Sequence, residues 1–364
     1  MYSRRDLFLK LFGTMAATGV TPLFAGPGRE YRRGGMVYRR LGQTDLFPSL
    51  LAFGSHTDFA YRVRAGSGTV LSMEGQKRRD RQLAHAIDLG INTLDVYEDE
   101  GQWEPVEQLT RGRRGKVIIS LRWKEHEYIG NTIDRGAKLF GYVDMIRIYV
   151  NDFERVDDAL LEAWDALRKA KEAGKVRAIG VSSHNEQALM PALGELEGLD
   201  YVLFPYNFIH ARADFMEFLP AAQAKGIGLI AIKPLAMGSI TNMDPRAHSG
   251  PKPESESVVM LGSRKMVMLP AAVAELTRTL NRLPDETLCQ AAMRFVFSRP
   301  FLSAVFTGMW DDQWIQDNYA ALQRSGALSS TEEAALKEVS TIAQSHSLIW
   351  LPPSYRWLEE RWQQ

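Results

Sequence analysis

The sequence predicts an α/β fold: a (β/α)8 TIM barrel with an N-terminal β-hairpin, long βα loops and a C-terminal extension. Three observations predict it. Short apolar runs with strand character recur eight times along the 364 residues. Segments with helical periodicity separate these runs. No G-x-G-x-x-G pattern follows the first run, which argues against an open, doubly wound sheet, the main alternative.

The eight strand candidates are short and continuously apolar, as expected for a parallel sheet that helices cover. They are Leu50–Phe53, Thr93–Asp95, Val117–Ser120, Met145–Tyr149, Ala178–Val181, Tyr201–Phe204, Leu229–Ile232 and Ala304–Thr307. The stretch from Met36 to Phe47 comes before them and is expected to form two short strands around a glycine-containing turn. Eight βα units after a hairpin favour a closed barrel.

The segments between the strands carry the period of amphipathic helices. Apolar residues step by four, four and three through residues 156–167, which places one apolar stripe against a core. Residues 288–296 repeat the pattern. Gly174 is expected to end the first of these helices, and Asn185 to cap the next helix along the chain.

Two long connections, Ser55–Gln76 and Gly238–Pro270, follow the first and seventh predicted strands. Both lie on the βα side, where barrel enzymes build their sites. Each is a candidate lid, with a surface insertion as the equally weighted alternative. Residues 346–364 form an aromatic tail, which is expected to pack back across the barrel, with a partner surface as the alternative.

Composition excludes several kinds of function. Lys and Arg number 44, as do Asp and Glu, so no basic excess points to nucleic acid. The single cysteine, Cys289, excludes an internal disulfide and an all-cysteine metal site. The seven histidines lack metal-ligand spacing, so no metal is expected. A small molecule is the expected ligand, with a protein partner as the alternative.

Residues 1–28 differ from the rest of the chain. Arg4 and Arg5 precede a short, uncharged and partly apolar segment, and together they resemble a bacterial twin-arginine export signal. The apolar run is short for a membrane span. We therefore expect export to the periplasm or another extracytoplasmic compartment, with transient membrane contact through this segment. An uncleaved anchor and a basic arm on a cytoplasmic protein are the alternatives.

From Val37 to about Leu322 the sequence resembles the aldo-keto reductase superfamily. The motifs that carry the resemblance occur in the family's order. They are Tyr38–Gly42, Gly90–Asp95, Gly174–His184, Tyr206-Asn207, Gly226–Leu235, Thr307-Gly308 and Asp317-Asn318. Gly174–His184 is the most specific of them. The resemblance implies a barrel over residues 36–345 and the reduction of aldehydes or ketones with NAD(P)H.

The family's chemistry needs a proton-donating tyrosine, a lysine paired with an aspartate, and a histidine that orients the carbonyl. By the resemblance, the aspartate is Asp95. Glu100, Arg122 and Tyr149 hold the positions of the tyrosine, the lysine and the histidine. Three of the four positions are therefore replaced, and Tyr97 is a nearby phenol that offers a substitute donor.

Cofactor binding is implied only by the resemblance. The corresponding residues are Ser182, Ser183, Asn207, Lys233, Gly308 and Asn318. Asp311 and Asp312 stand where the family often offers a basic residue to the adenosine phosphate, and two acids there would repel a 2′-phosphate. NAD, or no dinucleotide, is therefore at least as well supported as NADPH.

Three functions remain open. In the first, Asp95, Glu100, Arg122 and Tyr149 converge at the barrel mouth and carry out proton abstraction, elimination or epimerisation on an anionic small molecule. The alternative for these residues is a structural relic in which both acids pair with Arg122. The second function is an NAD(P)-dependent carbonyl reductase with displaced catalytic groups. The third is a non-catalytic scaffold or binding protein.

Overall fold

The computed structural model describes most of the predicted barrel. The described residues are 30–66, 68–123, 128–150, 156–184, 186–207, 212–235, 257–261, 264–268 and 285–325. The signal-like segment 1–28, Asn185 and the aromatic tail 346–364 lie outside them. Within the described ranges, no helix is long and apolar enough to cross a membrane.

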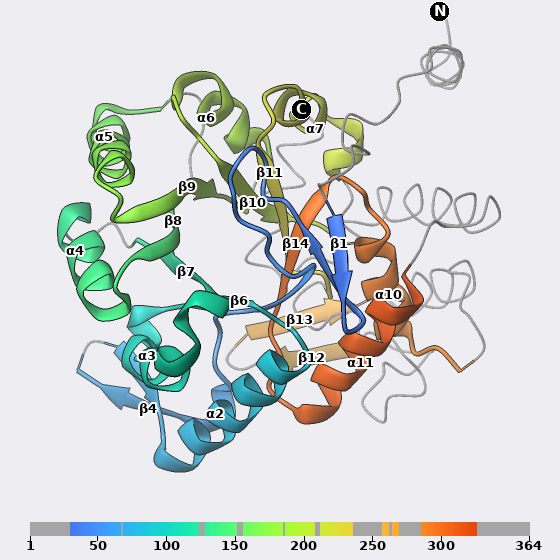
Figure 1. Ribbon diagram of the computed structural model, residues 1–364. Coiled ribbons are helices and arrows are strands. Elements are labelled where there is room, and N and C mark those ends of the chain that lie inside the picture. Colours follow the sequence, from blue (N-terminus) through green and yellow to red (C-terminus); the bar gives the residue numbers. More distant parts are fainter. Residues whose placement is uncertain are drawn as a thin grey trace, which may run out of the picture.

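Eight parallel strands close into a barrel in the order β3-β6-β7-β8-β9-β10-β11-β14 (Figure 1). They are β3 (Leu51–Phe53), β6 (Thr93–Val96), β7 (Ile118–Arg122), β8 (Val143–Tyr149), β9 (Val176–Ser182), β10 (Tyr201–Pro205), β11 (Gly228–Ile232) and β14 (Leu302–Thr307). All eight predicted strands are confirmed, and no strand end differs by more than two residues. The (β/α)8 barrel prediction is therefore confirmed.

Helices surround the strands (Figure 1). They are α2 (Met73–Asp88), α3 (Trp103–Thr110), α4 (Ile129–Phe140), α5 (Asp158–Glu172), α6 (Leu189–Glu195), α7 (Phe218–Ala224), α10 (Leu288–Phe297) and α11 (Asp312–Arg324). Short 3-10 helices are η1 (Phe59–Tyr61), η2 (Glu98–Glu100), η3 (Arg111–Lys116), η4 (Glu186–Ala188) and η5 (Arg212–Phe215). The stripe predicted on residues 156–167 lies mostly along α5, where Trp164 and Leu167 are buried, while Val156 is buried just before the helix begins. Gly174 follows the end of this helix at a φ of +72°, as its predicted role requires.

The N-terminal hairpin is present but begins earlier than predicted. β1 (Glu30–Arg33) pairs antiparallel with β2 (Met36–Arg39), so the predicted first strand is the second. The predicted turn is present, since Leu41 N donates to Leu46 O at 2.9 Å. The returning chain pairs with β2 only at an isolated antiparallel bridge between Tyr38 and Ser49, just beyond the predicted segment. Gly42 adopts a φ of +55°, and a Cβ there would stand 2.6 Å from a backbone oxygen. Leu41 and Leu46 thereby close the amino-terminal end of the barrel interior.

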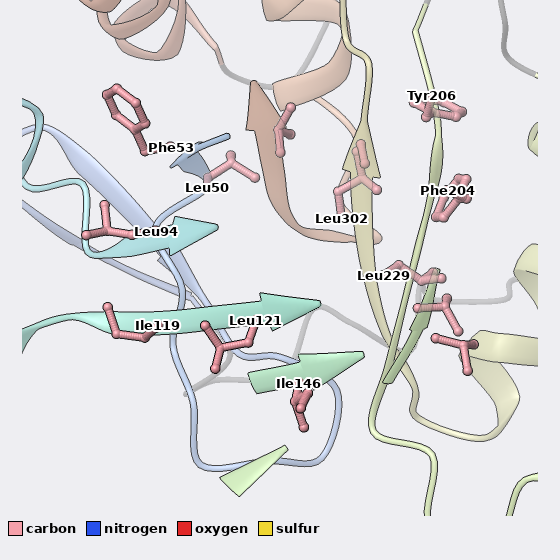
Figure 2. Close-up of a cluster of buried hydrophobic side chains, with 14 of the residues drawn as sticks. Leu50, Phe53, Leu94, Ile119, Leu121, Ile146, Phe204, Tyr206, Leu229 and Leu302 are labelled. Atoms are coloured by element: carbon pink, nitrogen blue, oxygen red, sulfur yellow. The ribbon is translucent and has the colours of Figure 1, made fainter. Parts of the chain in front are cut away.

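Alternation along the strands divides the core into two layers. The smaller layer fills the barrel interior and includes Ile118, Met145, Tyr201 and Ile230. The larger layer lies between the strands and the helices, and Figure 2 shows part of it, including Leu94, Ile119, Leu121 and Ile146. The alternation that turns Leu94 toward the helices turns Asp95 into the barrel.

Both long connections contain a small antiparallel hairpin. The connection after β3 forms η1 and then pairs β4 (Arg62–Ala65) with β5 (Gly68–Leu71) before α2 begins. The connection after β11 contains β12 (Ser257–Leu261) and β13 (Arg264–Met268). A lid role for either connection stays a prediction.

Candidate active site

Asp95 is the centre of a buried charged network at the carboxyl end of the barrel strands. It lies on β6, and Arg147 lies on β8; both side chains are buried. Arg147 Nη1 donates to Asp95 Oδ1 at 2.6 Å, and Nη2 donates to Oδ2 at 2.9 Å. Ser120 Oγ donates to Oδ1 at 2.9 Å. This two-point contact fixes the guanidinium in the barrel interior.

Arg147 was missed by the sequence-based predictions, although the strand pattern contains a signal for it. On β8 the inward-facing row is Met145, Arg147 and Tyr149, so a cation in an apolar strand points into the barrel and needs a buried partner. Asp95 supplies it from β6, with only β7 between the two strands. Burial acts to lower the pKa of Arg147, but nearby Asp95 outweighs it and the pKa is raised above its ordinary value. The guanidinium therefore stays protonated.

Tyr97 continues the inward row of β6 just beyond the strand end. Its Oη lies 3.4 Å from Arg147 Nη2, which donates to it. The guanidinium carbon of Arg122 lies 4.1 Å from the Tyr97 ring centroid, and the edge-on His56 ring lies 5.2 Å from it. The phenol is half-buried. A carboxylate, a cation and a phenol thus follow one another from the barrel interior to its mouth.

Glu100, on η2, lies in a second hydrogen-bond network, which touches the first through the contact of His56 with Tyr97. Its Oε2 accepts hydrogen bonds from Thr57 N and Oγ1, each at 2.7 Å, and from Arg62 Nη2 at 2.8 Å. His56 Nδ1 lies 2.7 Å from Oε1. Burial alone would raise the pKa of Glu100, but bonds from His56 and Thr57 outweigh it and lower the pKa to about 2. Because Arg62 begins β4, the anionic Glu100 ties the β4–β5 hairpin to the barrel.

Glu100→Gln is expected to lower the free energy of unfolding by about 3 kcal/mol at pH 7, because folding lowers this pKa from 4.5 to about 2. A carboxyl with a depressed folded-state pKa stabilises the protein above its unfolded-state pKa, and that stability is lost as pH falls through the folded-state pKa. The penalty should therefore shrink below pH 4.5 and disappear near pH 2. Urea unfolding at several pH values measures it.

Glu98→Gln is the matched control for this prediction. Glu98 lies on the same 3-10 helix, but its side chain is 46% exposed where it pairs with Arg135. Loss of the Glu98 charge should therefore change the free energy of unfolding only slightly. A penalty for Glu100→Gln that is the same at pH 3 and pH 7 would contradict the electrostatic origin.

The arrangement gives neither carboxylate the accessible oxygen that a general base needs. Asp95 and Glu100 are both buried, and every carboxylate oxygen already has a hydrogen-bond partner. Arg122 pairs with neither of them. Its Nη2 instead lies 3.7 Å from Asp99. The structural pairing of both acids with Arg122 is therefore not observed, and base chemistry at these acids has no support in the geometry.

Tyr149, which the sequence resemblance assigns to the position of the family's histidine, ends β8, and an imidazole lies beside it. Its Oη is 2.8 Å from His184 Nδ1. His184 follows β9, whose Ser182 is in register with Tyr149. An imidazole from the end of the neighbouring strand thus lies against Tyr149. In the sequence, the signal that could have identified His184 is its position at the end of the Gly174–His184 motif.

The predicted cofactor residues share one arc of the mouth, because β9, β10, β11 and β14 are successive neighbours in the barrel. Ser182 and Ser183 are buried at the end of β9. Asn207 follows β10, and its Nδ2 donates to Lys233 O at 2.9 Å, where Lys233 has a φ of +56°. Gly308 follows β14, and Asn318 is buried on α11.

The acids at the start of α11 have different surroundings. Asp311 caps the helix by accepting from Gln313 N at 2.8 Å, and Arg78 Nη2 donates to it at 2.6 Å. Asp312 has a side chain 68% exposed, 3.8 Å from His85. Asp311 thus binds the backbone N–H of Gln313, which could otherwise bind an anion. Asp312 places a second carboxylate at the same end of the helix.

No group of three or more His, Cys, Asp or Glu side chains in the described ranges has the arrangement of a metal site. The expectation of a site without a metal stays a prediction.

Known proteins match this chain in sequence over most of its length. It is 24% identical to L-galactose dehydrogenase of Arabidopsis thaliana over 331 residues, covering 86% of this chain and 96% of that protein. It is 25% identical to L-glyceraldehyde 3-phosphate reductase of Escherichia coli O157:H7 over 340 residues, covering 84% and 92%. It is 26% identical over 351 residues to a probable voltage-gated potassium channel subunit beta of Arabidopsis thaliana, covering 88% and 100%.

Solved structures show the same fold. The apo and holo forms of aldo-keto reductase AKR11C1 from Bacillus halodurans each superpose with a TM-score of 0.63 at 20% identity, covering 83% of this chain and 95% of theirs. The model of the Aldo/keto reductase family matches residues 65–341. The chain therefore belongs to the aldo/keto reductase family.

Proposed function

We propose that this protein is an NAD(P)-dependent oxidoreductase of small aldehydes or ketones in which Tyr97 donates the proton. The family's usual arrangement is altered, because Glu100 stands at the tyrosine position. One observation carries the proposal: Asp95 binds both terminal nitrogens of Arg147, and Arg147 donates to Tyr97 Oη. A phenol next to a paired cation is what protonation of a carbonyl oxygen requires.

Each side chain has a distinct role in the proposed reaction. A bound nicotinamide dinucleotide supplies the hydride. Tyr97 gives its proton to the carbonyl oxygen, and Arg147 stabilises the phenolate that remains because its charge is fixed nearby. Asp95 holds the Arg147 guanidinium in place from inside the barrel. Tyr149, oriented by His184, holds the carbonyl oxygen from the β8 side of the mouth.

The residues on the cofactor arc fit a dinucleotide without a 2′-phosphate. Gly308 leaves space, since a Cβ there would meet only Trp310 atoms, 3.6 Å away or more. Asp312 would repel a phosphate at the start of α11. We expect NADH to bind at least about tenfold more tightly than NADPH, a difference near 1.4 kcal/mol, and to support reduction across a panel of aldehydes and ketones.

Quenching of protein fluorescence by each dinucleotide measures this preference. Asp312→Arg should reduce the difference in affinity between NADH and NADPH, because the change replaces a charge that repels the 2′-phosphate with one that attracts it. The matched control is Asp158→Arg, which makes the same change in the first turn of α5. NADPH binding as tight as NADH binding by the unaltered chain would contradict the preference, and no binding of either at millimolar concentration would refute the reductase proposal.

Export is a second part of the proposal, supported by Arg4, Arg5 and the uncharged segment that follows them. A folded barrel, with or without its cofactor, suits a route that carries folded proteins. Fractionation of bacterial cells that produce the chain tests it. Recovery of the protein only from the cytoplasm would contradict export.

A further inference from the structure

We infer that Arg122 binds an anionic group of the substrate, so that the preferred substrate is a small aldehyde or ketone with a carboxylate or phosphate close to its carbonyl. The inference rests on the proposed function, because it takes Tyr97 Oη as the point to which the carbonyl oxygen binds.

Arg122 differs from the other arginines that surround residues 95–100. Three acids of that segment have arginine partners within hydrogen-bond distance. These pairs are Asp95 with Arg147 at 2.6 Å, Glu98 with Arg135 at 2.7 Å and Glu100 with Arg62 at 2.8 Å. Among the described residues, the carboxylate paired with Arg122 is that of Asp99, 3.7 Å away, which is too far for a hydrogen bond. Over the part of the chain that the structure describes, the Arg122 guanidinium makes no hydrogen bond, so its N–H donors are available to a ligand.

The position of Arg122 places these donors beside the reacting group. It ends β7, in register with Arg147 on β8, and its side chain is 22% exposed at the mouth. Its guanidinium carbon lies 4.1 Å from the centroid of the Tyr97 ring. A carbonyl bound to Tyr97 Oη therefore lies next to a planar cation whose shape matches a carboxylate or phosphate. Arg147 cannot take this role, because Asp95 already occupies both of its terminal nitrogens.

Packing on Tyr97 is the competing role for Arg122, and matched substrates separate the two. We would measure kcat/KM for glyceraldehyde 3-phosphate against glyceraldehyde, and for glyoxylate against glycolaldehyde. The wild type should prefer the charged member of at least one pair by about 10- to 100-fold. The preferred pair shows whether the anion is a phosphate or a carboxylate.

Arg122→Met should remove this preference, because kcat/KM should fall at least about tenfold more for the charged member than for the neutral member. Arg122→Lys should keep part of it, since the charge remains but the planar fork is lost. The matched control is Arg135→Met, which removes a cation that Glu98 already binds, and it should keep the preference. No charge preference in the wild type, or an equal loss of activity toward both members of a pair in Arg122→Met, would overturn the inference.

A binding measurement separates failure of this inference from failure of the proposed function. Calorimetry would follow oxamate, its neutral analogue oxamide and inorganic phosphate, with circular dichroism to confirm that each variant is folded. Binding of oxamate or phosphate to the wild type but not to Arg122→Met supports the anion site even if no carbonyl compound is reduced. Reduction without charge preference, together with no anion binding, overturns the anion site and leaves the reductase intact.

Discussion

Tyr97→Phe is expected to lower kcat for carbonyl reduction by about 10²- to 10⁴-fold, the range that a positioned proton donor contributes. The phenyl ring keeps the contacts with Arg122 and His56, and only the hydroxyl that Arg147 binds is lost. The variant should therefore fold normally and bind the dinucleotide as the wild type does. Steady-state oxidation of NADH, with dinucleotide binding measured in parallel, provides the test.

Two further variants make this result interpretable. Tyr128→Phe removes a phenol that is 62% exposed before α4, and its activity should equal that of the wild type. Tyr149→Phe removes the phenol that His184 orients and should have the smaller effect of the two mouth variants. If Tyr149→Phe were the more damaging change and Tyr97→Phe were fully active, the proton donor would be Tyr149.

Arg147→Met is expected to lower the free energy of unfolding by about 3–5 kcal/mol, because it leaves the buried Asp95 carboxylate without its ion-pair partner. It should also abolish reduction, since Tyr97 loses the hydrogen bond from the paired cation Arg147. Urea unfolding and the NADH assay measure the two effects separately.

Arg147→Met combined with Asp95→Leu separates structure from chemistry. Replacing a buried ion pair with apolar side chains of similar size often restores stability. We expect the double variant to recover most of the lost stability and none of the activity. A double variant with restored stability and wild-type turnover would show that the pair serves only the fold.

The barrel was predictable because each strand is a short apolar run between amphipathic segments, and closure buries every such run. The N-terminal hairpin was predicted only in part, for the opposite reason. Its first strand, Glu30–Arg33, is fully exposed and carries three charged residues, so no hydrophobic pattern marks it. The turn at Gly42 depends on a close approach to the backbone near β11, which is nearly 200 residues further along the chain.

The site was predictable in part. Arg147 links Asp95 to Tyr97, and Arg122 packs on the Tyr97 ring, whereas Tyr149 ends β8 beside His184. Arg147 follows from strand alternation alone, since an inward cation on β8 needs the inward acid on β6. The partners of Glu100 come from the inserted connection after β3, and no local pattern specifies that a loop 40 residues earlier will donate to it.

The most direct measurement is a crystal structure with oxidised dinucleotide and a carbonyl-containing inhibitor bound. We predict the inhibitor's carbonyl oxygen within about 3 Å of Tyr97 Oη, with Arg147 still bound to Asp95. A carbonyl oxygen held by Tyr149 alone, with the Tyr97 hydroxyl turned away from both inhibitor and nicotinamide, would contradict the relocation of the proton donor to Tyr97.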